Sequence, residues 1–87
     1  MKLVLAILKD DDIEAVLQAL TMQGFRATRV ASTGGFFHKG NTSLLIGVDD
    51  NRVDAAIQVM REKTVPAEDN SKRGTIFVVP VERYEQL

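Results

Sequence analysis

The stretch from residue 32 to residue 41, STGGFFHKGN, combines the residue types that a nucleotide site needs. Its glycines leave backbone N–H groups open to an anion, and Phe36 and Phe37 offer aromatic faces on which a planar base can stack. The neighbouring basic residues Arg26, Arg29 and Lys39 would together neutralise a phosphate. The stretch is not a P-loop, because it lacks the Gly-Lys-Ser/Thr ending. A hairpin loop without a ligand explains the same residues equally well.

The charge distribution favours an anion in the middle of the chain. The net charge is −1, yet no acidic residue occurs from Ala15 to Val48. A balanced net charge gives no reason to expect DNA, RNA or an anionic membrane as a partner. A small anion is compatible with this pattern, and so is an ordinary solvated surface.

Three polar residues beside this stretch are candidate contacts. Arg26 and Thr28 lie two apart on an expected strand, so their side chains share one face and suit a phosphate or a base edge. Asn41 opens the returning strand, and its amide can pair with an adenine edge. A polar stripe on an edge strand and an ordinary Asn turn are the alternatives.

The remaining polar residues do not assemble a catalytic or metal site. The chain has no cysteine and one histidine, His38, without an acid or nucleophile near it in sequence. Asp10, Asp11 and Asp12 are read as helix caps, because successive residues at a helix start do not converge on a metal. Asp49 and Asp50 receive the same interpretation. We therefore expect no enzyme activity, no metal and no cofactor.

Apolar spacing and turn residues predict the elements that position these groups. Strands are expected at residues 3–8, 25–31, 42–48 and 75–81. One helix should begin at the aspartates 10–12 and end near Gln23, before Gly24; a second should begin at Asp49 or Asp50 and stop at residues 64–66. Pro80 places the last strand at a sheet edge.

The order strand, helix, strand, strand, helix, strand predicts a single α+β domain, residues 1–87, with the ferredoxin-like βαββαβ fold. Right-handed crossovers place both helices on one face of the antiparallel sheet. The runs LVLAIL and IFVV are nevertheless apolar on both faces. Since a sheet face exposed to water should alternate, we expect the second face to be buried against other subunits of an oligomer.

No apolar run reaches the length of a membrane span of about 20 residues. The opening run LVLAIL is too short for a signal peptide, so we expect a cytoplasmic protein without membrane insertion. The first and third strands carry no stacking aromatics, which argues against an RNA-recognition module.

Two segments, FRATRVASTGGFFHKGNTSLLIGVDDNRVD and GTIFVVPVERYEQL, resemble the PII-like family of cyclic-di-AMP receptors. This resemblance implies a homotrimer that binds cyclic-di-AMP, or a related adenine nucleotide, in the clefts between subunits and relays the signal to a downstream protein. The ligand-binding residues that it implies are Arg26, Ala27, Thr28, Gly35, Phe36, Phe37, Asn41, Gly47 and Gln86. Phe36 is expected near a base, and Gln86 on a tail that closes over the cleft. A different small anion, or a purely protein-binding role, is the alternative.

The chain departs from the family pattern in three places. The connection between the second helix and the last strand is short, roughly VPAEDNSKRG, where the familiar receptors have a long one. Those receptors often have Asn where this chain has Gly24, and Leu where it has Phe37. We therefore expect the ligand contacts to be kept and the signal that the long connection gives to a partner to be lost. A shortened member that keeps the trimer and changes its ligand is the alternative.

Overall fold

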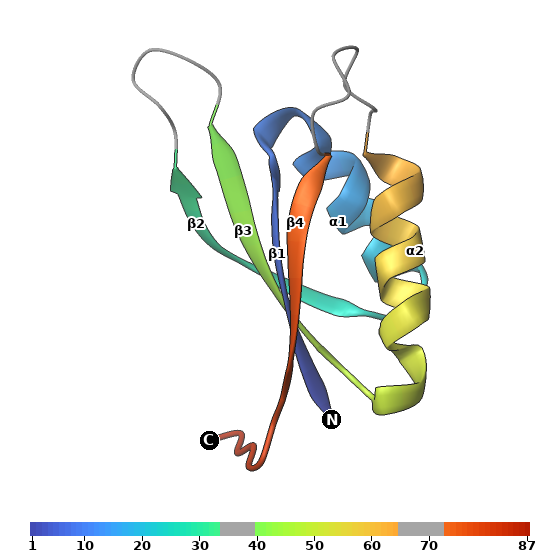
Figure 1. Ribbon diagram of the computed structural model, residues 1–87, viewed down its shortest axis with the longest axis vertical. Coiled ribbons are helices and arrows are strands. Elements are labelled where there is room, and N and C mark those ends of the chain that lie inside the picture. The colour runs from blue at the N-terminus through green and yellow to red at the C-terminus, as the bar shows by residue number, and fades with distance from the viewer. Residues whose placement is uncertain (34–39, 65–72) are drawn as a thin grey trace.

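A computed structural model of the protein describes residues 1–33, 40–64 and 73–87, with residues 31–33 described by their backbone (Figure 1). Four antiparallel strands form one sheet in the order β2-β3-β1-β4. The strands are β1 (Lys2–Lys9), β2 (Arg26–Thr33), β3 (Asn41–Val48) and β4 (Gly74–Pro80). Helices α1 (Ile13–Met22) and α2 (Val53–Lys63) lie together on one face of the sheet. The predicted ferredoxin-like, PII-like α+β fold is confirmed.

The helix starts differ from the prediction in one respect. Each helix follows a 3-10 turn, η1 (Asp10–Asp12) before α1 and η2 (Asp50–Arg52) before α2. No side-chain cap bond is formed by Asp12 or Asp49. The caps expected at Asp12 and Asp49 are therefore not formed; a 3-10 turn leads into each helix instead, and Asp10 accepts a hydrogen bond from the hydroxyl of Thr42.

The end of α1 agrees with the prediction. Gly24 has a φ of 84°, in the left-handed region that glycine adopts without strain, and its N–H donates to the Thr21 carbonyl at 3.0 Å. The reversal carries Phe25 directly into the core and starts β2 at Arg26. This glycine therefore fixes where the second strand begins relative to the helix.

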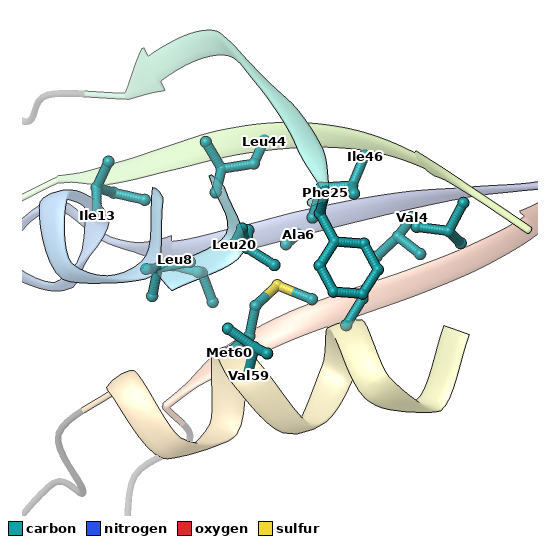
Figure 2. Close-up of a cluster of buried hydrophobic side chains, with 13 residues drawn as sticks. Val4, Ala6, Leu8, Ile13, Leu20, Phe25, Leu44, Ile46, Val59 and Met60 are labelled. Atoms are coloured by element: carbon teal, nitrogen blue, oxygen red, sulfur yellow. The ribbon is translucent and has the colours of Figure 1, made fainter. Parts of the chain in front are cut away.

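The core lies between the sheet and the two helices, as Figure 2 shows. Alternate residues of β1 and β3 point toward the helices, where they meet the apolar stripes of α1 and α2. Fully buried side chains in this layer include Val4, Leu8, Val16, Leu20, Leu44, Ile46 and Met60. Phe25 closes the layer at 5% exposure.

The other side of the sheet, which we call the open face, is also apolar. Strand register places Leu5 directly between Leu45 and Phe77, and Leu3 beside Val79. Phe77 remains 51% exposed. Across residues 1–33, 40–64 and 73–87 no helix covers this face, so the predicted uncovered apolar surface is confirmed for the single chain.

Both outer strands carry features of sheet edges. β4 is an edge strand, as Pro80 predicted, but it ends at Pro80, one residue before the expected end at Val81. β2 is the opposite edge, and its register with β3 shifts between Arg29 and Ala31, a bulge at Val30. No helix within the described ranges is long and apolar enough to cross a membrane.

Candidate functional site

A cavity of about 410 Å³ opens at the end of the sheet where both chain ends lie. Three residues implied by the family resemblance line it, namely Arg26, Gly47 and Gln86. They come from β2, β3 and the C-terminal tail, so the fold gathers residues from three separate parts of the sequence. This cavity is the candidate binding site.

Strand register explains the pairing at its centre. Arg26 lies directly opposite Gly47 in the β2–β3 ladder, and directly opposite residues share a sheet face. Both therefore lie on the open face. A Cβ added to Gly47 would have no atom within 4 Å. The backbone of β3 is consequently accessible at this point, beside an exposed guanidinium.

The tail reaches the cavity because it is anchored beside the start of β1. The N–H of Val81 donates to the Met1 carbonyl at 3.1 Å, immediately after β4 ends. From there Tyr84 and Gln86 extend to the cavity wall. Tyr84 is 59% exposed and adds an aromatic ring that sequence reasoning did not select. An exposed ring beside cationic side chains is a suitable surface for a planar base.

Thr28 and Ala27 occupy opposite faces of β2. Thr28 pairs with Leu45 on the open face, two residues beyond Arg26, as the predicted spacing requires. Ala27 pairs with the buried Ile46 and packs against the core. The methyl group of Ala27 therefore faces the helices, and only its backbone is available to a ligand on the open face.

Asn41 lies at the far end of the sheet. It pairs with Lys9 of β1 and with Thr33 of β2, and it lines a different cavity of about 340 Å³. At about 3.3 Å per residue, the strand separates Asn41 from Gly47 by roughly 20 Å. Gly35, Phe36 and Phe37, with His38 and Lys39, lie outside the described residues.

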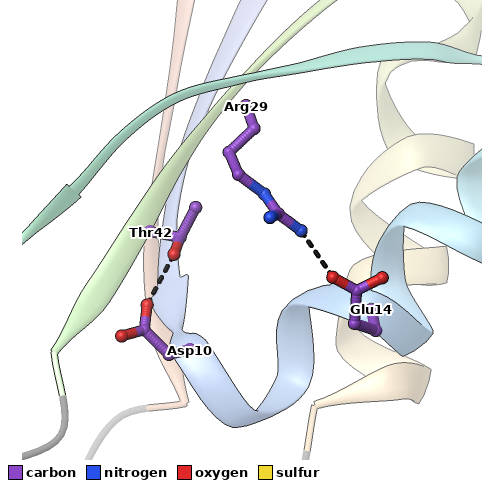
Figure 3. A network of polar contacts seen from close by, with 4 residues as sticks. All are labelled: Asp10, Glu14, Arg29 and Thr42. Carbon is purple, nitrogen blue, oxygen red and sulfur yellow. Dashed lines mark hydrogen bonds and ion pairs between the residues drawn. The ribbon is translucent and has the colours of Figure 1, made fainter. Parts of the chain in front are cut away.

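Arg29 does not join Arg26. It pairs with the buried Leu44 on the helix side of the sheet, and its Nη2 donates to Glu14 Oε1 at 2.7 Å (Figure 3). Residues three apart on a strand point to opposite faces, so the grouping of these two arginines around one phosphate is wrong. Arg29 instead links β2 to α1.

Arg52 is the main cavity residue that sequence reasoning missed. It belongs to η2, lines the same cavity as Arg26, and holds its guanidinium carbon 4.1 Å from the centroid of the Phe25 ring. Its Nη2 also donates to the Gln23 carbonyl at 3.1 Å. The contact joins residues 27 positions apart along the chain, so no local spacing rule could indicate it.

An ion pair stands beside the cavity. The N-terminal ammonium of Met1 lies 3.0 Å from Asp50 Oδ1. Its hydrogen bond and its charge lower the pKa of the Asp50 carboxyl below the ordinary 3.8. This pair attaches Met1, the residue before β1, to the turn η2 that carries Arg52.

The fold defines a small α+β domain of the ferredoxin-like type, with an apolar open face and a cavity lined by two arginines. More particularly, the chain belongs to the cyclic-di-AMP receptor family, whose model matches residues 1–70. That range includes Arg26, Gly47 and Arg52 and stops before β4 and the tail. Family membership confirms the resemblance seen in the sequence motifs.

A solved structure extends the comparison to the remaining strand and tail. The crystal structure of a functionally unknown protein from Pediococcus pentosaceus ATCC 25745 is 29% identical to this chain, with a TM-score of 0.78. The match covers 99% of this chain and 96% of that one.

Proposed function

We propose that this protein is a non-enzymatic receptor that binds cyclic-di-AMP, or a related adenine nucleotide, in clefts between the subunits of a homotrimer. Membership of the cyclic-di-AMP receptor family carries the ligand assignment. The anion-binding chemistry of the cavity supports it, since Arg26 presents an exposed guanidinium beside the bare backbone of Gly47.

The distribution of the expected ligand residues supports a cleft between subunits. Arg26, Gly47 and Gln86 line one cavity, while Asn41 lies at the opposite end of the same sheet. One small ligand reaches both groups when the Arg26 end of one chain meets the Asn41 end of its neighbour. The proposed site therefore contains residues of two chains.

The open face supplies the surface that would hold such a trimer together. Leu3, Leu5 and Leu45 are half-buried, and Phe77 and Val79 are exposed at 51% and 43%. A contiguous apolar sheet face of this kind is typical of an interface, because its burial releases water from apolar surface. We place three such faces around the trimer axis.

Within the cleft, each residue type has a distinct task. Arg26 and Thr28 would bind phosphate or base edges, Phe36 would stack on a base, and Gln86 would close the cleft from the tail. Gly35, Phe37 and Asn41 complete the site in this proposal, with Ala27 and Gly47 contributing backbone groups. Binding would then order the cleft and change a surface read by a downstream protein in the cytoplasm.

Isothermal titration calorimetry tests the proposal. The purified protein should give saturable heat with cyclic-di-AMP at one ligand per chain, and weaker or no heat with ATP and cyclic-di-GMP. Light scattering after size-exclusion chromatography should give three times the subunit mass. A folded trimer that gives no heat with any adenine nucleotide would contradict the ligand assignment.

A second candidate is a PII-like trimer that binds another small anion or only a protein. The feature that favours it is Gly24, where many family members carry Asn, next to a cavity whose two arginines suit any phosphate or carboxylate. Heat with a different anion, and none with cyclic-di-AMP, would select this alternative.

A further inference from the structure

Arg52 shares a cavity with Arg26, Gly47 and Gln86, although the family motifs pointed only to the other three. It is the last residue of η2 and is partly buried. The cavity thus has a second guanidinium, which comes from a different element from the first. Its surroundings indicate what it binds.

Two contacts fix the Arg52 side chain in place. The guanidinium lies over the ring of Phe25, 4.1 Å from its centroid, and Phe25 is itself only 5% exposed. Nη2 donates to the Gln23 carbonyl at 3.1 Å. A side chain held in advance loses less conformational entropy when a ligand arrives, so it binds more tightly than a free arginine.

These contacts leave donors unused. A guanidinium has five N–H groups, and the carbonyl of Gln23 takes one of them. In the part of the chain that the structure describes, no ion pair joins Arg52 or Arg26 to Asp49, the carboxylate on the same cavity wall. Asp50 is engaged by the N-terminal ammonium. The positive charge of Arg52 therefore remains available to an anion.

Gly24 keeps the approach to these donors open. A Cβ at this position would have Arg52 Nη1 as its one neighbour within 4 Å, at 4.0 Å. The φ of 84° also disfavours any larger residue. The space beside Nη1 is consequently free of a side chain from position 24, and a phosphate oxygen can enter it.

We propose that Arg52 binds a phosphate group of the nucleotide, as a second cationic contact beside Arg26. The inference rests on the proposed function, since it assigns one more ligand contact within the same cavity. It adds that the ring of Phe25 and the bare backbone of Gly24 prepare the guanidinium for that phosphate.

Arg52→Met tests this assignment by calorimetry with cyclic-di-AMP. Methionine keeps a flexible apolar chain over the Phe25 ring and removes the charge. We expect the affinity to fall by about tenfold, the size of one lost charge-assisted hydrogen bond. The affinity should also change less as NaCl is raised from about 50 to about 300 mM. Salt screens the attraction between Arg52 and the phosphate, and the variant lacks that attraction. The trimer mass should stay unchanged, and the melting temperature should fall only slightly, because the hydrogen bond to the Gln23 carbonyl and the cation–π contact with Phe25 are lost.

Arg61→Met is the matched control. Arg61 is an exposed arginine of α2 that lines a different cavity of about 350 Å³. Its replacement removes the same charge from the protein, so it corrects for any general electrostatic effect. Affinity and salt dependence should equal those of the wild type.

The outcomes separate the two proposals. If the wild-type protein gives no heat with cyclic-di-AMP, the proposed function fails whatever Arg52 does. If the wild type binds and Arg52→Met binds with equal affinity and equal salt dependence, the assignment of Arg52 is wrong. Should the variant lose the trimer, NMR of the wild-type arginine Nε–H groups decides, because an Arg52 signal unchanged at saturating ligand would overturn the assignment.

Discussion

Arg29 on β2 and Glu14 on α1 form an ion pair across 2.7 Å, on the side of the sheet that the helices cover. Arg26, three residues earlier on the same strand, lies on the open face and lines the cavity. The two arginines therefore have different tasks: Arg29 links a strand to a helix, and Arg26 is available to a ligand.

This difference gives a matched pair of variants. Arg26→Ala should weaken cyclic-di-AMP binding at least tenfold in calorimetry, because a charged hydrogen-bond donor is removed from the cavity. Arg29→Ala should leave the affinity unchanged and lower the free energy of unfolding by about 0.2–1 kcal/mol, the usual range for an exposed ion pair. Equal losses of affinity in both variants would contradict the separation of the faces.

Leu5→Glu tests the role of the open face. Leu5 lies at its centre, between Leu45 and Phe77, and a carboxylate there cannot be buried without a large desolvation cost. We expect light scattering to report monomers. The control is Met22→Glu on α1, where the native side chain is 80% exposed, and this variant should remain trimeric. A trimeric Leu5→Glu would show that subunits meet elsewhere.

Gly47→Ala should affect the ligand and leave the subunit intact. A Cβ at Gly47 meets no atom within 4 Å, so the added methyl group projects into the cavity without a clash inside the chain. We expect weaker cyclic-di-AMP binding in calorimetry with an unchanged melting temperature. Unchanged affinity would mean that the ligand stays away from β3 at this position.

Gly74→Ala should have the opposite effect. A Cβ there would overlap the Leu8 side chain and lie 2.9 Å from the carbonyl oxygen of Ile7, a backbone atom that cannot move alone. Chemical denaturation should show a loss of about 1–3 kcal/mol, the typical cost of overpacking. Ligand affinity of the folded fraction should match that of the wild type, because Gly74 does not line the cavity with Arg26.

Asp50 gives a prediction about pH. Since its pKa is lowered in the folded chain, its pairing with the N-terminal ammonium stabilises the fold above pH 3.8, and this contribution is lost as the pH falls through the lowered value. NMR titration should find the Asp50 carboxyl below 3.8. Residues added before Met1 displace the ammonium and should return the pKa toward 3.8. Because Lys2 also lowers this pKa, a small shift should remain; a pKa as low after the extension as before it would exclude the ammonium as the main cause.

Local patterns in the sequence determined the fold. Short apolar runs, helical spacing and turn residues were sufficient for the order of strands and helices. Gly24 ends α1 where the freedom of glycine at positive φ predicts it, and Pro80 lies on an edge strand, where its missing N–H predicts it. The apolar residues on both faces of β1 correctly predicted an uncovered sheet face. Apolar runs, helical spacing and turn residues depend only on neighbours within a few positions along the chain. They can therefore be recognised in a single sequence.

One error was avoidable and one was not. Strand alternation could have separated Arg26 from Arg29, since three residues along a strand reverse the face. The missing side-chain caps at Asp12 and Asp49 were not predictable, because a 3-10 turn and an aspartate cap begin with the same residues. The Asp10 carboxylate can accept a hydrogen bond from the helix backbone or from the hydroxyl of Thr42. Which one forms depends on the register of β3 against β1.

The composition of the cavity was decided only by the tertiary structure. Gly24, Phe25 and Arg26 line the cavity as consecutive residues of the chain. Arg52 reaches the same cavity through its contact with Phe25, and Tyr84 and Gln86 reach it because the tail is anchored at Met1. Such contacts form when helices and strands pack, and their energy comes from atoms distant along the chain. The spacing of residues along the sequence therefore does not predict these long-range contacts. Packing of the core brings the residues to one surface.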